Sequence, residues 1–276
     1  MLTWLKNRFR RGPVVPVVRL SGVIAASSGA FGSRTLSVES VAPLLKRAFD
    51  MRGAKAVALA INSPGGSPAQ SSLIGQRIRL LAKEKDVKVI AFVEDVAASG
   101  GYWLACAADE ILVDTSSIVG SIGVISAGFG FQDAIQRIGV ERRVHTSGDR
   151  KAMLDPFRPE KAEDVDRLHR LQADIHEDFK AWVRERRAGK LKGDDATLFS
   201  GEFWTGRRGI ELGLADGLGE LRATLQARYG DKVHLPVIGP RRRLLSRFGL
   251  ETSLEGIGPA TLAAIEERLH WQRFGL

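Results

Sequence analysis

The sequence predicts an α/β fold in which a mostly parallel β-sheet is built from βαβ units and flanked by helices. Apolar runs of strand length, such as 56–61 and 87–93, alternate with stretches of helical pattern, such as 38–51 and 68–85. Strands that alternate with helices in this way are typical of parallel sheets. The 276 residues are 44% hydrophobic, which is enough for a large domain with a well-filled core.

The expected elements follow one another as strands and helices of ordinary length. The expected strands are 14–20, 56–61, 87–93, 110–113 and 140–146. The expected helices are 38–51, 68–85, 99–107, 161–187 and 218–229. In the helix 38–51 the apolar side chains that recur on one face are Val41, Leu44, Leu45 and Phe49. They predict the face that packs on the sheet.

The segment 161–187 has a strong helical period and predicts a long amphipathic helix. Its apolar residues recur at steps of three or four, and they are Val165, Leu168, Leu171, Ile175, Phe179 and Trp182. Gly189 and Gly193 end this helix. Thr205 and Gly213 fit the N-cap and the C′ position of a short helix that follows.

We expect three parts along the chain. They are a basic N-terminal segment 1–13, a domain 14–235, and a C-terminal helical extension 236–276. The extension holds a basic run and then an amphipathic helix through Leu262, Ile265 and Leu269.

The net charge of +9 is concentrated at the two ends. The basic residues there are Lys6, Arg8, Arg10 and Arg11, and then Arg241, Arg242, Arg243 and Arg247. Both ends also carry large apolar residues, and this mixture favours peripheral contact with an anionic membrane. Solvated chain ends have the same composition. No aromatic–basic motif supports nucleic-acid binding, so no nucleic acid is expected as a partner.

No stretch has the length and apolarity of a transmembrane helix, and no apolar run follows the charged N-terminus as in a secretory signal. We therefore expect a cytoplasmic protein with peripheral contact at the inner membrane surface. The single cysteine, Cys106, fits a reducing compartment and a buried helix position.

A glycine-rich turn follows the apolar run 56–61. In the segment 62–67, Asn-Ser-Pro-Gly-Gly-Ser, Pro64 fixes one φ angle, while Gly65 and Gly66 allow backbone shapes that a β-carbon forbids. At the carboxyl edge of a parallel sheet, such a turn can aim N–H groups at a developing oxyanion. The simpler interpretation is an ordinary strand–helix turn.

Ser99 follows a strand and opens a helix, with Gly100 and Gly101 directly after it. Free N–H groups at the start of a helix favour negative charge on its oxygen, and the glycines let a substrate backbone approach. Ser99 is either a plain N-cap or a nucleophile, and a nucleophilic hydroxyl needs a base.

Three kinds of base remain open from the residues alone. Lys151 lies in a loop-like segment followed by apolar residues, and burial against apolar groups favours the neutral amine that accepts a proton. His145 stands near the end of an expected strand but has no evident carboxylate partner. Glu94 and Asp95 sit beside the serine in sequence, and we expect them to face away or to cap the turn.

Five segments, taken together and in order, resemble the signal peptide peptidase A family of serine peptidases, family S49. The segments are 61–67, 97–102, 120–124, 147–151 and 204–216, and the resemblance covers about residues 14–230. It implies a ClpP/crotonase-like fold, with Ser99 as nucleophile and Lys151 as general base. It also implies that Ser121 hydrogen-bonds the lysine and that Gly65, Gly66 and the amide of Gly100 form the oxyanion hole.

The resemblance further implies a ring- or dome-like homo-oligomer whose sites can draw on adjacent subunits. It implies cleavage of hydrophobic peptides, such as residual signal peptides, with no metal and no cofactor. Long members carry a duplicated domain and a membrane anchor, whereas we expect one domain and no anchor here. Many members have an acid directly after the lysine, where this chain has Ala152, and this puts the substrate preference in question.

We therefore predict a serine endopeptidase with a Ser99–Lys151 dyad. Two other interpretations share the fold. A crotonase-type acyl-CoA enzyme would use a similar turn with a carboxylate and no nucleophile. A non-catalytic membrane-associated scaffold would keep the fold and the oligomer without the chemistry.

Overall fold

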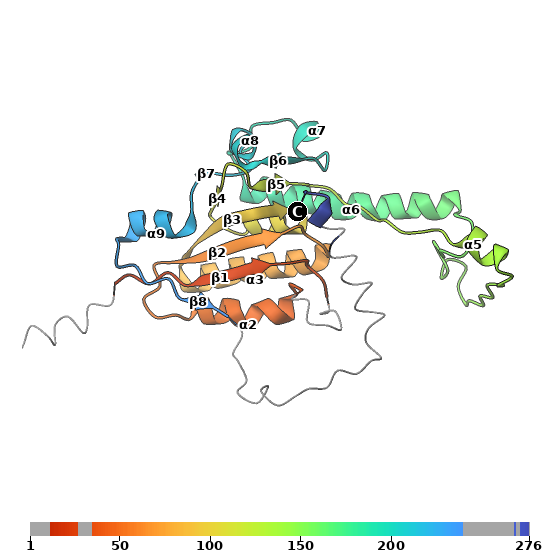
Figure 1. Cartoon of the computed structure of the whole chain (residues 1–276), viewed down its shortest axis with the longest axis horizontal. Helices are drawn as coiled ribbons and strands as arrows, with labels where there is room; N and C mark the ends of the chain where they lie inside the picture. The colour runs from red at the N-terminus through yellow and green to blue at the C-terminus, as the bar shows by residue number, and fades with distance from the viewer. Residues whose placement is uncertain (1–11, 27–34, 240–267, 269–270, 276) are drawn as a thin grey trace, which may run out of the picture. The chain divides into compact units, whose positions relative to one another are not determined.

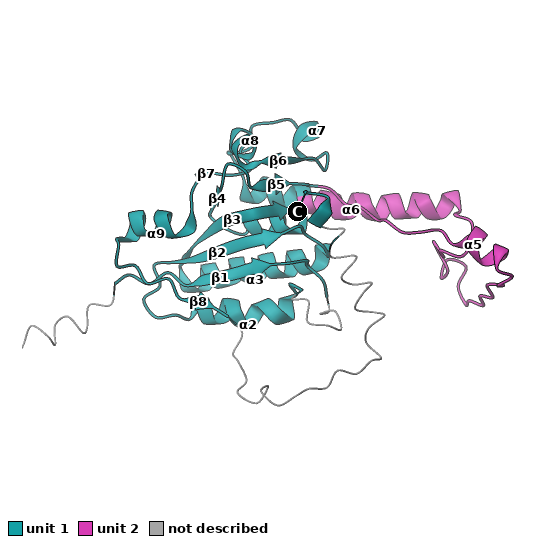
Figure 2. Ribbon diagram, in the orientation of Figure 1, with its two compact units in different colours: residues 1–122, 180–276 teal, residues 123–179 magenta. Residues whose placement is uncertain are grey.

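The computed structural model describes residues 12–26, 35–239, 268 and 271–275. The chain divides into two compact units, unit 1 (residues 1–122 and 180–276) and unit 2 (residues 123–179), which are teal and magenta in Figure 2. The expected boundaries of the three parts, 1–13, 14–235 and 236–276, stay a prediction. Both basic clusters and the helix through Leu262, Ile265 and Leu269 lie outside the described residues.

A mostly parallel sheet forms the centre of unit 1 (Figure 1). Its strands are β1 (Val17–Ser21), β2 (Ala56–Ser63), β3 (Lys88–Ala98), β4 (Glu110–Val113), β5 (Ile118–Gly120), β6 (Phe203–Thr205), β7 (Gly217–Leu218) and β8 (Val237–Ile238). The order along one path is β6-β5-β3-β2-β1-β8, and β4 pairs with both β3 and β7. Each ladder between these strands is parallel except that of β5 with β6, so the predicted fold class is confirmed.

Eight helices are described. They are α2 (Val38–Phe49), α3 (Pro68–Lys85), α4 (Gly100–Cys106), α5 (Gln132–Arg137), α6 (Ala162–Arg186), α7 (Asp195–Leu198), α8 (Gly206–Glu211) and α9 (Leu221–Tyr229). The predicted helices 38–51, 68–85, 99–107 and 161–187 are confirmed within a few residues. The predicted helix 218–229 begins later, because Gly217 and Leu218 pair with β4 and Glu220 caps the first turn of α9.

Both faces of the sheet are covered, which explains why β2 is a continuous apolar run. On one face the core contains Ala58, Ala60 and Phe92, packed against Leu225 of α9. Alternate residues of β2, such as Leu59, point to the other face. There α2, α3 and α4 pack on the strands and on one another (Figure 1). The buried face of α2 includes the expected Val41, Leu45 and Phe49.

Polar side chains cap the N-termini of α3 and α8. The Ser67 side chain accepts a hydrogen bond from Gln70 N–H at the start of α3, and Pro68 takes the first helical position, where its missing N–H costs nothing. Thr205 caps α8 and Gly213 follows that helix with φ +76°, so both predictions for this helix are confirmed.

The central strand β3 is longer than the predicted 87–93 and changes partners along its length. Its first half pairs with β4 through residues 90–93, and its second half pairs with β5 through residues 96–98. The register with β2 shifts between these halves. Asn62 bridges the irregularity, since its Nδ2 donates to Asp95 Oδ2 at 2.6 Å and its Oδ1 accepts from Val96 N–H at 3.2 Å. β3 ends at Ala98, directly before Ser99.

Unit 2 contains α5, the first part of α6 and the irregular chain before and between them. The predicted strand 140–146 is wrong, because these residues are largely exposed and form no ladder. Val140 and Val144 stand four positions apart, with only charged residues between them, so the alternation that a half-buried strand requires is missing. These charged residues form ion pairs, including Arg143 with Glu141 at 2.7 Å and Arg142 with Asp155 at 3.4 Å.

A buried arginine joins the end of α6 to the segment before β7. Arg187 has 2% of its surface exposed, donates twice to Gly213 O, and lies 2.7 Å from Asp216 Oδ2. Burial alone raises the pKa of the Asp216 carboxyl. Hydrogen bonds from Arg187, Lys190 and Ile111 N–H outweigh burial and hold that pKa below its usual range. The carboxylate therefore stays ionised and paired at neutral pH.

Substitution of Arg187 by methionine should destabilise the protein, because the change leaves the Asp216 carboxylate buried without its main partner. We expect a loss of about 3–5 kcal/mol in the free energy of unfolding, measured by urea titration. The control is Arg170→Met on the exposed part of α6, which should change that free energy by about 0.5 kcal/mol or less. Equal unfolding curves for Arg187→Met and wild type would contradict this account.

Candidate active site

Ser99 stands at the junction of β3 and α4 in a strained backbone conformation. Its φ is +51° and its ψ −123°, and its side chain makes no capping hydrogen bond to the helix that it precedes. Its N–H donates to Gly120 O at 2.8 Å, and its carbonyl accepts from Trp103 N–H at 3.0 Å. A non-glycine residue at such angles persists only where its surroundings fix it. The residue is half-buried, and its hydroxyl does not cap α4.

The turn after β2 touches this junction backbone to backbone. A β-carbon on Gly65 would lie 2.8 Å from Gly100 N and 2.8 Å from Ser99 Cβ, closer than packed atoms approach. A β-carbon on Gly101 would lie 2.3 Å from Ser63 O. Glycine is therefore required on both sides of the contact. The structure thus brings Gly65 into contact with Ser99 and Gly100, while the predicted oxyanion hole of Gly65, Gly66 and Gly100 stays a prediction.

The neighbouring segment 22–25 orients the turn. Ile24 N–H donates to Gly65 O at 2.8 Å, and Ser67 N–H donates to Ile24 O at 2.8 Å. In a parallel bridge of this kind the N–H of the middle residue, Gly66, points to the other side. That side is the one where β3 lies, because β2 has β1 and β3 as its neighbours. The Gly66 N–H therefore faces away from the segment 22–25.

Ser121 lies beside Ser99 at the end of the next strand. Ala98 and Gly120 are paired in the β3–β5 ladder, so the two serines each follow one of two paired residues. Ser121 is 6% exposed, has φ +53°, and donates its N–H to Glu202 O at 2.7 Å. The structure therefore brings the two predicted serines to one edge of the sheet.

Lys151 belongs to unit 2, whereas both serines belong to unit 1, so the pairing of Lys151 with Ser99 stays a prediction. Lys151 is exposed within a turn, and its N–H donates to Gly148 O at 3.2 Å. Leu154, three residues on, has φ +55°. His145 is exposed in the irregular chain of unit 2, so the expected position at a strand end is wrong for it.

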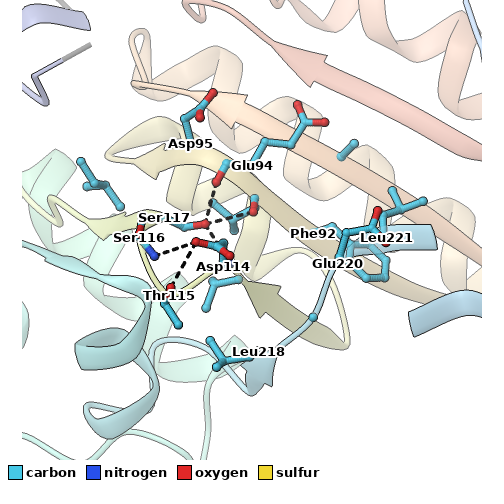
Figure 3. A pocket seen from close by; sticks show the side chains of 15 residues that line it. Phe92, Glu94, Asp95, Asp114, Thr115, Ser116, Ser117, Leu218, Glu220 and Leu221 are labelled. Atoms are coloured by element: carbon cyan, nitrogen blue, oxygen red, sulfur yellow. Dashed lines mark hydrogen bonds between the residues drawn. The ribbon is translucent and has the colours of Figure 1, made fainter. Parts of the chain in front are cut away.

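The two carboxylates next to Ser99 in sequence are engaged elsewhere, as expected. Glu94 pairs with Arg19 at 2.9 Å, and Asp95 accepts from Asn62. Both line a cavity of about 780 Å³ where β3 changes partners (Figure 3). Ser99, Ser121 and the glycines of the turn are not among its lining residues.

The other carboxylates of this cavity are also used locally. Asp114 accepts from Ser116 N–H at 2.9 Å, and that hydrogen bond lowers the pKa of its carboxyl. Glu220 accepts from the first amides of α9, which lowers the pKa of its carboxyl in the same way. The cavity is therefore distinct from the serine site. The carboxylates of Asp114 and Glu220 accept hydrogen bonds from backbone N–H groups.

Cys106 is the other nucleophilic side chain near this helix, and it is not suited to catalysis. It is fully buried at the end of α4, as predicted, and burial raises the pKa of its thiol to about 12. A thiol that stays protonated and inaccessible is a poor nucleophile. Ser99 is thus the accessible hydroxyl or thiol at this helix.

The central sheet and the two touching turns define a ClpP/crotonase-like α/β protein. A solved structure with the same fold is a variant of the 1510-N membrane-bound stomatin-specific protease in complex with a substrate peptide. The similarity covers 83% of this chain and 94% of that chain, with a TM-score of 0.51 and 14% sequence identity. Residues 81–232 match Peptidase family S49. The chain belongs to this family, the signal peptide peptidase A family.

Two relatives illustrate the range of proteins that contain a similar chain. The chloroplastic serine protease SPPA of Arabidopsis thaliana is 30% identical over 229 residues, or 81% of this chain and 33% of that protein. A protein of Brucella abortus named as the Na⁺/H⁺ antiporter NhaA is 54% identical over 284 residues, or 99% of this chain and 38% of that protein. The chain thus spans about a third of the first relative and little more than a third of the second. Among the described residues no helix has the length and apolarity needed to cross a membrane.

Sequence reasoning missed the residues that hold the two turns. The segment 22–25 that pairs with Gly66, the Ser63 hydroxyl that donates to Gly22 O at 2.7 Å, and Glu202 opposite Ser121 were not expected. Each acts through a backbone contact across a long sequence separation, which leaves no local pattern. The sequence indicates only the glycines of the two turns, which stand out by their residue type.

Substitution of Gly65 by alanine should disrupt the site more than the fold. The new β-carbon would meet Gly100 N and Ser99 Cβ at 2.8 Å, at a φ of +105° that costs an L-residue about 1–3 kcal/mol. We expect labelling of Ser99 by a fluorophosphonate to fall at least tenfold. Gly128→Ala serves as the control, since a β-carbon there meets nothing within 4 Å. Unchanged labelling of a folded Gly65→Ala variant would show that the contact is not needed.

Proposed function

We propose that the protein is a serine endopeptidase that cleaves hydrophobic peptides with Ser99 as nucleophile and Lys151 as general base. The observation that carries the proposal is the conformation of Ser99. Its hydroxyl does not cap α4, its backbone is strained, and a glycine turn packs directly against it. Membership of Peptidase family S49 supports the same chemistry.

In the proposed reaction, Ser99 Oγ attacks the carbonyl carbon of the scissile peptide bond, and the neutral amine of Lys151 takes the hydroxyl proton. The lysine then gives that proton to the leaving amine, which departs as the new N-terminus. Water attacks the acyl-enzyme ester with the lysine again as base, and the ester bond to Ser99 breaks. No metal or other cofactor takes part.

The amides of Gly66 and Gly100 are the proposed oxyanion donors. The amide of Gly100 directly follows Ser99, and the Gly65–Gly66 turn packs against the same junction, which supports this assignment. Preorganised donors of this kind stabilise the tetrahedral intermediate by about 3 kcal/mol each. Ser121 is proposed to hydrogen-bond the Lys151 amine, which its place at the next strand end supports.

Hydrophobic peptides, such as remnants of signal peptides or membrane-derived peptides, are the proposed substrates. Related proteins carry protease names, and one solved variant of the same fold holds a substrate peptide. Peripheral contact with an anionic membrane through the two basic ends would bring the protein to such peptides.

A homo-oligomer is proposed from the surface of unit 2. Several large apolar side chains there are exposed, namely Ile125, Phe129, Phe131, Ile138 and Val140. Phe129 is 76% exposed and Ile138 is 73% exposed, values that are unusual for a monomer when such residues cluster in one unit. Copies of the same chain that cover this surface would form the ring or dome.

Ser99→Ala should reduce cleavage of a hydrophobic fluorogenic peptide to the uncatalysed level, and Lys151→Ala should lower kcat by about 10²–10⁴-fold. The matched control for the lysine is Lys161→Ala, also exposed and ten residues away, which should keep wild-type turnover. Circular dichroism checks that each variant is folded. Full turnover in a folded Lys151→Ala variant would move the role of base to another residue.

The pH profile tests the base independently. We expect the pH profile of kcat/KM for wild type to differ in shape from that of Lys151→Ala, because the proposed base is missing from the variant. The same assay with an acyl-CoA thioester tests the crotonase alternative. Thioester turnover without peptide cleavage would refute the peptidase proposal. Binding to liposomes with no turnover of either substrate would refute it as well and favour the scaffold.

A further inference from the structure

A short aromatic turn, residues 271–275, packs against the strand ends that precede the two serines. In Figure 1 this turn is dark blue and lies at the tip of β3, beside the mark C. One apolar cluster joins it to β3 and β5, and its members are Val96, Ala98, Ile118, Trp271 and Phe274. The turn and these strands all belong to unit 1. The aromatic turn is therefore part of the same packed body as both serines.

The aromatic turn is closed by hydrogen bonds of its own backbone. Phe274 N–H donates to Trp271 O at 3.0 Å, and Gly275 N–H donates to Gln272 O at 3.0 Å. Gly275 has φ +75°, a conformation that glycine adopts readily. These local bonds keep the two aromatic residues next to each other, so both can pack on the same strands.

Phe274 also contacts β6, the strand at one end of the order β6-β5-β3-β2-β1-β8. Its ring meets the Phe203 ring edge to face, with centroids 5.0 Å apart and an interplanar angle of 69°. This is a favoured arrangement of two aromatic rings. β6 has only three residues, so few ladder hydrogen bonds hold it. Its position therefore depends on side-chain contacts such as this one.

Trp204 covers the strand ends from the other face. Successive side chains of a strand point to opposite faces, so Phe203 and Trp204 lie on opposite sides of β6. A β-carbon on Gly120 would lie 2.7 Å from the Trp204 ring, which shows how closely that ring approaches the end of β5. The strand ends are thus enclosed between Trp204 on one face and the aromatic turn on the other.

The enclosed strand ends carry both serines of the site. Ser99 directly follows Ala98, and its N–H donates to Gly120 O of β5 at 2.8 Å. Ser121 N–H donates to Glu202 O, directly before β6, at 2.7 Å. A shift of β5 or β6 would therefore move the backbone of both serines. A displacement of about 1 Å at a reacting group can lower the rate about a hundredfold.

We propose that Trp271 and Phe274 are positioning residues for the reaction at Ser99. They cover the ends of β3, β5 and β6 on the face opposite Trp204, and so they keep Ser99 and Ser121 in a fixed relation to each other. The inference rests on the proposed function. Because both aromatic residues act through the backbone of the strands, their loss affects kcat more than KM.

Substitutions of the two rings in the full chain test this inference. Phe274→Ala removes the contact with Phe203 and uncovers Val96 and Ala98, whereas Phe274→Leu keeps an apolar cover without the ring contact. Phe274→Ala should lower kcat for a hydrophobic fluorogenic peptide at least tenfold, with KM changed less than about twofold. Phe274→Leu should lower kcat only about threefold, and Trp271→Ala should act in the same direction.

Hydrogen exchange measured by mass spectrometry gives a second readout, which does not depend on activity. In Phe274→Ala, exchange in the segments that contain the Ser99 and Ser121 amides should become at least tenfold faster, because both amides donate across the strand ends. Exchange in β1, which lies on the other side of β2 from β3, should stay as in wild type.

The matched control is Phe49→Ala. Phe49 is a buried phenylalanine at the end of α2, six residues before β2 begins, so it lies toward the edge of the sheet opposite the serines. This variant should also lose stability, but it should keep kcat and the exchange of the two serine segments within about twofold of wild type. An equal loss of kcat in folded Phe49→Ala would overturn the inference, because general destabilisation would then explain the effect.

The outcomes separate the inference from the proposed function. If Phe274→Ala fails to fold by circular dichroism, Phe274→Leu decides in the same two assays. An active wild type with unchanged kcat and unchanged exchange in the deciding variant overturns the inference alone. A wild type that does not cleave peptide, or a Ser99→Ala variant that does, refutes the proposed function and the inference with it.

Discussion

The close approach of two backbone turns is the constraint on which the rest of the structure depends. The turn after β2 and the junction after β3 meet with no side chain between them, because Gly65, Gly100 and Gly101 have no β-carbon to keep them apart. The ladder between β2 and β3, which pairs Ser63 with Ala97, brings the two segments to this contact. This contact places the Gly65–Gly66 turn directly next to Ser99.

The strain at Ser99 has to be balanced by the structure around it. A non-glycine residue at φ +51° and ψ −123° raises the free energy of the folded state by about 1–3 kcal/mol. The neighbouring α4 offsets this through complete burial and through the cations at its carboxyl end. The helix is thus fixed at its far end by hydrogen bonds to Arg186 and Arg79, and at its near end by glycine contacts. A hydroxyl next to a helix fixed at both ends has little freedom to leave its position.

Much of unit 1 could be predicted from the sequence because its signals are local. Buried strands read as apolar runs, and α3 is marked by Ser67 and Pro68 at its start. The glycines of the site were visible for the same reason. The strands β5 to β8 have two or three residues each, too few for a periodic pattern, and they form only because longer strands are already in place. The change of partners along β3 is likewise a property of the whole sheet.

Unit 2 was harder to predict because its apolar residues do not fill a core of their own. The periodic stripe of α6 correctly predicts a helix, but Leu171 within that stripe is 53% exposed, whereas Phe179 and Val183 further on are buried. Periodicity shows that a face is apolar and does not show what covers it. On the proposed mechanism this difference has a use. The proposed nucleophile, Ser99, lies next to a packed core, whereas the proposed base, Lys151, lies on a unit with exposed apolar side chains. In the proposed homo-oligomer, other copies of the chain would cover these apolar side chains.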